Sequence, residues 1–174
     1  CVDSTLEVGD RTIVREFCTL HRGTRDKKIT KIGSDCLLMA YSHVAHDVVI
    51  GDNVIVSISV NIAGHAEIDD YAIIGGCTPV HQFCKIGKHS FIGGGRLILQ
   101  DVPPYILATG EPLRYAGINS VGLRRRKFSL SSRSQIKKAY SLIYQSELNI
   151  SQAVDKIKSD FDRTDEIDII LEFI

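Results

Sequence analysis

Aliphatic side chains recur at every sixth position through most of the first hundred residues. The series runs through Val2, Val8, Val14 and Leu20 and then, after a gap, through Ile32, Leu38, Val44, Ile50, Val56, Ile62, Ile68, Ile74, Val80, Ile86, Ile92 and Ile98. A period of six fits neither the 3.6-residue repeat of an amphipathic α-helix nor the strict alternation of a half-buried strand. Each hexad therefore predicts one short strand and one tight turn, in a chain built from stacked repeats.

Three hexads would close one triangular coil, so that residues eighteen apart stack at the roughly 4.8 Å spacing of neighbouring strands. The aliphatic column then points inward and forms the core of a prism, with residues such as Gly51 and Asp69 at the turns. The charged segment from Arg22 to Lys31 interrupts the phase, and we interpret 22–31 as a loop that leaves one coil. An array of β-hairpins is the alternative fold for the same repeat.

The repeat ends after Ile98, where Pro103 and Pro104 remove backbone donors and are expected to stop strand pairing. We therefore expect a prism over 1–103 and an exit segment over 104–128. From Ser129 onward the apolar spacing becomes helical, which predicts a small C-terminal helical subdomain over 129–174 with Ser151 as the cap of its second helix. The apolar positions of this subdomain are Ile136, Ala139, Tyr140, Ile143, Tyr144, Ala153, Ile157, Ile167, Ile170, Leu171 and Ile174.

Composition limits the class of partner and the cellular compartment. Twenty-one Lys and Arg residues balance twenty-one Asp and Glu residues, so no global field favours nucleic acid or a membrane surface. The five cysteines are odd in number and lack C-x-x-C spacing, which favours reduced thiols in the cytoplasm. We expect neither a membrane span nor an export signal. The chain opens without Met in mid-pattern, so we expect it to be N-terminally incomplete.

Four histidines lie in three strings of the repeat, and the coil period predicts which of them meet. Positions 46, 64 and 82 are eighteen apart, so His46, Gly64 and Gln82 are expected to form one column. His65 and His81 each lie one residue outside this column, and His43 lies three residues before it. All of them are expected to border one cleft, although solvated coil histidines are the alternative interpretation.

These residue types suit acyl transfer. A neutral imidazole is the usual general base for a hydroxyl at physiological pH, and Asp47 could orient His46. The backbone N–H of Gly64 could bind the oxyanion of an attacked thioester. The column contains no Ser or Cys, which favours direct attack by the substrate hydroxyl over a covalent acyl-enzyme.

A second polar cluster is basic. Seven cationic side chains lie between positions 124 and 138 with no acidic residue among them: Arg124, Arg125, Arg126, Lys127, Arg133, Lys137 and Lys138. A diphosphate contact, an acidic protein partner and a solvated helix start all remain possible for this run. RNA is less attractive as a partner, because only Phe128 is present to stack a base.

Taken together, these strings resemble the UDP-N-acetylglucosamine O-acyltransferases that begin lipid A biosynthesis. The matching strings are Arg-Glu-Phe-Cys-Thr-Leu-His-Arg-Gly-Thr (15–24), Ser-His-Val-Ala-His-Asp (42–47), Ile-Ala-Gly-His (62–65), Val-His-Gln-Phe (80–83), Gln-Asp-Val-Pro-Pro-Tyr (100–105) and Asn-Ser-Val-Gly-Leu-Arg-Arg-Arg (119–126). The resemblance implies a left-handed parallel β-helix in a homotrimer. It also implies transfer of an (R)-3-hydroxyacyl group from acyl carrier protein to the 3-hydroxyl of UDP-N-acetylglucosamine.

The resemblance assigns a role to each candidate residue. His46 becomes the general base, Asp47 its orienting carboxylate and Gly64 the oxyanion donor. The remaining roles are as follows: His43, His65, His81 and Gln82 line the sugar and pantetheine side, Asn119, Arg125 and Arg126 hold the nucleotide, Arg133, Lys137 and Lys138 face the carrier protein, and Gly94 sets acyl length. No metal or cofactor is expected, since acyl carrier protein brings the acyl group as a co-substrate.

The chain departs from the family pattern at three places. The family carries an Asp and a Lys in earlier coils that this chain lacks, and Val121 replaces an acidic residue found in many relatives. The apolar helical pattern also continues up to the last residue, Ile174, so we expect the last helix to be clipped at its C-terminus. The alternatives are a related N-acyltransferase, an acetyltransferase that uses coenzyme A, a β-helical zinc carbonic anhydrase, and a purely structural trimer.

Overall fold

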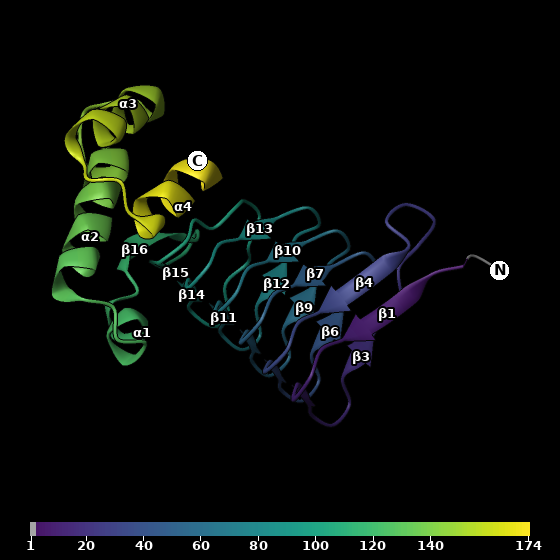
Figure 1. Cartoon of the computed structure of the whole chain (residues 1–174). Helices are drawn as coiled ribbons and strands as arrows, with labels where there is room; N and C mark the ends of the chain where they lie inside the picture. The colour runs from purple at the N-terminus through teal and green to yellow at the C-terminus, as the bar shows by residue number, and fades with distance from the viewer. Residues whose placement is uncertain (1–2) are drawn as a thin grey trace.

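The computed structural model describes residues 3–174, so Cys1 and Val2 lie outside the described residues. Short strands wind into a prism that has the N-terminal end at one extreme and a group of helices at the other (Figure 1). The strands are β1 (Thr5–Val8), β2 (Ile13–Val14), β3 (Thr19–Leu20), β4 (Ile29–Ile32), β5 (Leu37–Leu38), β6 (His43–Val44), β7 (Val49–Ile50), β8 (Ile55–Val56), β9 (Asn61–Ile62), β10 (Glu67–Ile68), β11 (Ile73–Ile74), β12 (Pro79–Val80), β13 (Lys85–Ile86), β14 (Phe91–Ile92), β15 (Ile106–Thr109) and β16 (Arg114–Ile118).

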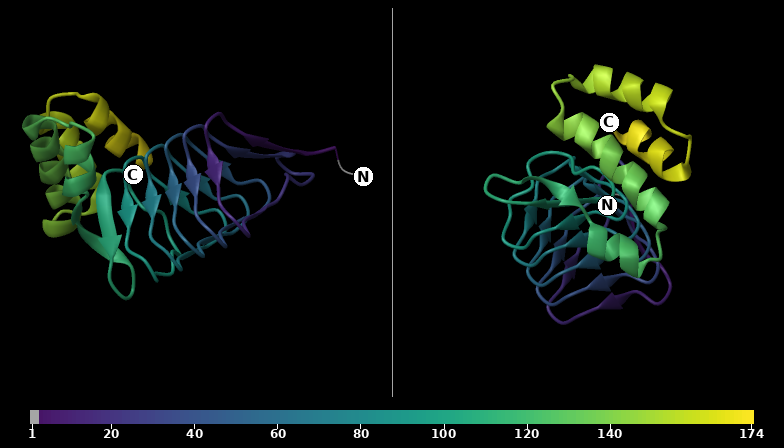
Figure 2. Two further views of the ribbon diagram at one scale, coloured as in Figure 1. Left: turned by 90° about the horizontal axis from the view of Figure 1, so that it is seen from below. Right: turned by 90° about the vertical axis from the view of Figure 1, so that its left-hand side faces the viewer.

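The strands form three sheets, one along each side of the prism. Their orders are β1-β4-β7-β10-β13, β2-β5-β8-β11-β14-β15-β16 and β3-β6-β9-β12. Partners such as Val49 and Glu67 are eighteen residues apart and run parallel. The column from Ile32 to Ile98 is at most 2% exposed at every member, so it is the core that the hexad period predicts. This is the expected left-handed parallel β-helix, and its open coils are visible in Figure 2.

The first described coil differs from the others. Strand β1 pairs with β4 at an offset of twenty-four, with Val8 opposite Ile32, so six extra residues leave the coil between them. The expected loop boundary at residue 31 is wrong, because Ile29–Ile32 is a strand that pairs with β1 along its whole length. Val8 and Val14 remain 44% and 43% exposed, since no further described coil covers them.

The prism also continues past the two prolines, which corrects the expected end at residue 103. Val102 pairs with Ile86, and β15 pairs in parallel with β14, so Ile106 becomes buried. Pro103 and Pro104 lie between these two pairings, at a corner where the ladder needs no N–H donor. Strand β16 then turns back antiparallel to β15.

Four helices follow: α1 (Ser120–Arg125), α2 (Leu130–Gln145), α3 (Ile150–Asp160) and α4 (Asp165–Phe173). Helix α1 was not expected from the sequence. Helix α2 begins at its cap Ser129 and buries Ile136, Ala139 and Tyr140. The expected cap at Ser151 is wrong, because Asn149 forms a capping box with Gln152 and thereby satisfies the first N–H groups of α3.

Two compositional expectations can be compared with the described part of the chain. Cys18, Cys36, Cys77 and Cys84 are all free thiols. Within residues 3–174 the helices are too short or too polar for any of them to cross a bilayer.

Candidate active site

One corner of the prism gathers the predicted catalytic residues. This corner follows strands β6, β9 and β12, which stack with offsets of eighteen. The register places His46, Gly64 and Gln82 in one column, as the sequence predicts. A backbone hydrogen bond from the His65 N–H to the His46 carbonyl, 3.2 Å long, ties the first two coils together at this corner.

His46 and Asp47 form the central pair. His46 Nδ1 lies 2.9 Å from Asp47 Oδ2, and the His46 side chain is 43% exposed whereas that of Asp47 is completely buried. Asp47 adopts a left-handed φ of 60°, a conformation that Asp tolerates better than most residues. Its N–H donates to Thr30 Oγ1 at 2.8 Å, which fixes the backbone of the pair. The free Nε2 edge of His46 can therefore face a substrate while Nδ1 is held from behind.

The Asp47 carboxylate is ionised in spite of its burial. Burial by itself raises the pKa of Asp47, but hydrogen bonds from the hydroxyl and N–H of Thr24 and from His46 outweigh it and lower the pKa to about 2. The Thr24 N–H donates to Oδ1 at 2.9 Å, and the Thr24 hydroxyl donates to Oδ2. A negative charge behind His46 would stabilise an imidazolium formed there if His46 took a proton from a substrate.

Gly64 lies directly against the His46 ring. A Cβ added at Gly64 would be 2.8 Å from His46 Cε1 and 3.1 Å from Nε2. Only glycine leaves the imidazole in its place. Gly64 is buried in the chain, and among the described residues its N–H makes no hydrogen bond with the backbone.

His65 is held inside the corner. Its side chain is only 12% exposed, and Nε2 lies 3.7 Å from Asp47 Oδ2 while Nδ1 lies 3.6 Å from Asp26 Oδ2. The ring stacks on Phe83 at 4.9 Å and meets His46 edge-on at 5.3 Å. These contacts suit a residue that supports the His46–Asp47 pair.

The other predicted lining residues are more open. His81 and Gln82 are exposed, and His81 Nδ1 lies 3.1 Å from the Gln82 carbonyl oxygen. His43 lies on the sheet face beside the corner, where Nδ1 is 2.7 Å from Thr19 Oγ1. Burial, and then the neighbouring His21, lower the pKa of His43, so its ring is neutral near physiological pH.

The arginines lie on another corner, which follows β10 and β13. Arg126 Nη2 donates to the Tyr71 carbonyl oxygen at 2.9 Å, and its guanidinium lies 5.1 Å from the centre of the Tyr71 ring. An open hollow of about 370 Å³ is lined there by Tyr71, His89, Arg125, Arg126, Lys127 and Phe128. Burial, and then Arg126 and Lys88, lower the pKa of His89 to about 4.

The structure uses Asn119 as a helix cap. Its Oδ1 accepts from the Gly122 N–H at 3.1 Å, and its Nδ2 donates to the His89 carbonyl oxygen at 3.0 Å. The basic run begins in the last turn of α1, where cations interact favourably with the helix dipole. This position corrects the interpretation of the run as a solvated helix start. Val121 is 51% exposed on the same helix.

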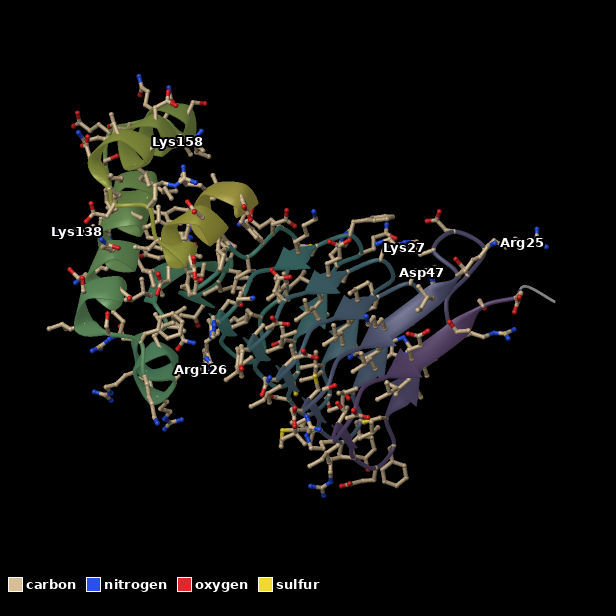
Figure 3. All side chains as sticks on the ribbon, in the orientation of Figure 1. Arg25, Lys27, Asp47, Arg126, Lys138 and Lys158 are labelled. Atoms are coloured by element: carbon tan, nitrogen blue, oxygen red, sulfur yellow. The ribbon has the colours of Figure 1, made fainter. Side chains whose placement is uncertain are left out.

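The two remaining predicted positions lie elsewhere. A Cβ at Gly94 would come within 3.0 Å of the Gly76 carbonyl oxygen, so any larger residue would crowd that corner of the prism. Arg133, Lys137 and Lys138 all lie on α2. Lys137 and Lys138 border a hollow of about 550 Å³ that reaches Lys156 and Phe161 of α3. Figure 3 shows Lys138 on α2, Arg126 beside α1 and Asp47 on the prism.

The catalytic corner also has donor atoms that could hold a metal ion. Ligand atoms of His46, Asp47 and His65 all lie within 4.8 Å of one another. However, the 2.9 Å between His46 and Asp47 is a hydrogen-bond length, and the Asp47 oxygens also accept from Thr24. These bonds favour a proton-transfer pair.

Sequence reasoning missed Thr24, Asp26 and Thr30. Thr24 and Asp26 belong to the loop that leaves the coil, so no period of eighteen relates them to Asp47, whereas Thr30 lies in β4, which pairs with β7 at that period. The only signal was indirect, because a loop that leaves a coil one turn before His46 must pass the same corner.

Known proteins resemble this chain along almost its whole length. Residues 101–174 match the family described as UDP N-acetylglucosamine O-acyltransferase, domain 2, and residues 29–57 match the bacterial transferase hexapeptide. A crystal structure of a UDP-N-acetylglucosamine acyltransferase from Bacteroides fragilis is 46% identical with a TM-score of 0.98, over 99% of this chain and 68% of that one. That from Campylobacter jejuni is 30% identical with a TM-score of 0.92, over 98% and 67%.

The curated relatives are longer than this chain. The acyl-[acyl-carrier-protein]–UDP-N-acetylglucosamine O-acyltransferase of Thiobacillus denitrificans is 41% identical over 97% of this chain, which spans 66% of that relative. The enzyme of the same name from Aliivibrio fischeri is 41% identical over 91% of this chain, which spans 61% of it.

Proposed function

This chain belongs to the UDP-N-acetylglucosamine O-acyltransferase family, and from that premise we propose the reaction of the protein that contains it. The protein transfers an (R)-3-hydroxyacyl group from acyl carrier protein to the 3-hydroxyl of UDP-N-acetylglucosamine, the first step of lipid A biosynthesis. The observation that carries the proposal is the hydrogen-bonded His46–Asp47 pair packed on Gly64.

The reaction proceeds by direct attack. His46 Nε2 takes the proton of the sugar 3-hydroxyl as its oxygen attacks the thioester carbonyl carbon. The carbonyl oxygen becomes an oxyanion that the Gly64 N–H binds, and Asp47 stabilises the imidazolium. When the tetrahedral intermediate collapses, the C–S bond breaks and the leaving pantetheine sulfur takes the proton from His46. The chain needs no cofactor for these steps, because the carrier protein delivers the acyl group.

The positions of the two polar clusters support a homotrimer. The histidine corner follows β6 and β9, whereas the arginine hollow follows β10 and β13 of a different sheet, so the two lie on different corners of one prism. One sugar nucleotide can reach both clusters when the corners of neighbouring subunits face each other. Arg125 and Arg126 then hold the diphosphate, and Asn119 supports that hollow through its bond to His89.

The remaining assignments follow the same geometry. His43, His81 and Gln82 line the sugar and pantetheine side of the histidine corner, and His65 stiffens it. The basic residues of α2 bind the acidic carrier protein, and they are Arg133, Lys137 and Lys138. Gly94 sets the acyl length, because glycine at this position leaves room for a long acyl chain. The free thiols and the soluble donor suit a cytoplasmic protein.

The test is acyl transfer by the intact protein with carrier proteins that bear hydroxyacyl chains of several lengths. We expect His46→Ala to reduce kcat by at least about a thousandfold while light scattering still reports a trimer. Treatment of the product with mild alkali distinguishes O-acylation from the N-acylation of a related N-acyltransferase, since alkali cleaves an ester and spares an amide. Wild-type turnover in His46→Ala, or a product stable to alkali, would contradict the proposal.

A further inference from the structure

The loop that interrupts the hexads forms a compact strap across the catalytic corner. We define the strap as residues 21–28, which lie between β3 and β4. Its base is closed at Gly23, whose N–H donates to the Thr5 carbonyl oxygen at 2.9 Å. A Cβ at Gly23 would overlap the backbone of Ile29, so glycine is required where the strap leaves and rejoins the coil.

Thr24 of the strap contacts both oxygens of Asp47. Its N–H donates to Oδ1 at 2.9 Å and its hydroxyl donates to Oδ2, the oxygen that also faces His46 Nδ1. The Asp26 N–H lies 3.3 Å from Thr24 Oγ1 and uses the acceptor side of that hydroxyl. The hydroxyl proton is thereby directed to Asp47. Thr24 therefore fixes the plane of the Asp47 carboxylate, and the carboxylate in turn orients the His46 ring through Nδ1.

The outer part of the strap is tied to the next coils. Lys27 Nζ lies 3.1 Å from Glu67 Oε1, and Lys85 Nζ lies 3.8 Å from Glu67 Oε2. Figure 3 labels Lys27 and Arg25 of the strap, together with Asp47. Exposed ion pairs of this kind contribute little, so the part-buried Thr24–Asp47 bonds hold the strap more firmly than these ion pairs do.

We propose that Thr24 is a positioning residue, which acts through Asp47 to hold the His46 imidazole in its reactive tautomer and orientation. The inference rests on the proposed function, in which His46 is the base. The titratable groups around His46 are Asp47 and His65, and Asp26 lies beyond His65. Loss of the Thr24 hydroxyl leaves His46 as the main donor to Oδ2. The imidazolium form of His46 is then stabilised more strongly in the variant than in the wild type.

The test compares Thr24→Val, which removes the hydroxyl and both of its hydrogen bonds at nearly constant volume, with Thr24→Ser, which retains it. The first readout needs no activity. The readout is the midpoint pH of carbethoxylation at His46, followed by peptide mass spectrometry in the intact protein. We expect the midpoint to rise in Thr24→Val and to return in Thr24→Ser, while Arg25→Gln at the exposed tip leaves it unchanged.

The second readout is turnover. We expect kcat to fall about tenfold in Thr24→Val, with KM for both substrates within about twofold of wild type, and to recover in Thr24→Ser. An unchanged His46 midpoint in Thr24→Val, or equal losses in the Val and Ser variants, would overturn the positioning role. A shifted midpoint in a protein whose wild type transfers no acyl group would uphold the role of Thr24 and refute the proposed function instead.

Discussion

Gly64 offers the most direct test of the proposed catalytic corner. Its replacement by alanine adds one methyl group, and this group would contact the ring of His46, the proposed base. A Cβ at Gly64 would lie 2.8 Å from His46 Cε1, about 0.7 Å inside the roughly 3.5 Å contact distance of two carbons. The three nearest atoms all belong to the His46 ring, so the imidazole has to move. A misplacement of about 1 Å costs on the order of a hundredfold in rate.

We therefore expect Gly64→Ala to lower kcat by about ten- to a hundredfold. The backbone of Gly64 lies outside the left-handed region, so alanine reduces the entropy of the unfolded chain and stabilises the protein by about 0.4–1 kcal/mol. This gain opposes the cost of the displaced ring. The melting temperature should thus change by no more than about 3 °C.

The assay is steady-state acyl transfer together with thermal unfolding of the same preparations. The matched control is Gly64→Ala in a His46→Ala background, where the added methyl group meets no ring. There we expect only the stabilising effect of alanine on the melting temperature. If Gly64→Ala keeps the kcat of the wild type, the reasoning that places the reactive imidazole against Gly64 is refuted.

Two further predictions concern the same pair. The pKa of Asp47 is lowered to about 2, so its charge contributes stability above its unfolded value near 3.9, and this contribution is lost as the pH falls through about 2. The wild type should therefore have a higher free energy of unfolding than Asp47→Asn at pH 6, and this difference should decrease by about 2 kcal/mol between pH 6 and pH 2. Urea titration measures both free energies, and a difference that stays constant with pH would contradict the prediction. Separately, the 2.9 Å between His46 and Asp47 is shorter than the roughly 3.3 Å between two ligands of tetrahedral zinc, so EDTA should leave turnover unchanged. Activity lost on chelation and restored by zinc would favour metal chemistry.

Some of the corner could not be predicted from the hexads. Tyr71 belongs to the repeat, yet its sequence did not indicate that Arg126, fifty-five residues later at the end of α1, would lie over its ring. Asn119 was expected to touch a nucleotide, and the structure uses both ends of its amide to cap α1 and to bind the His89 carbonyl. Contacts between the repeating coils and the non-repeating segment around α1 follow no sequence period, so spacing cannot predict them.

The sequence by itself determined the prism, its core column and the stacking of His46, Gly64 and Gln82, because a coil of fixed period converts spacing directly into position. Only the tertiary structure decided where the repeat stops and what stands behind the base. Pro103 and Pro104 ended the pattern but not the pairing, since a corner needs no N–H donor. Thr24 reaches Asp47 because a loop outside the period folds back onto the corner, and its path depends on three-dimensional packing that spacing does not encode.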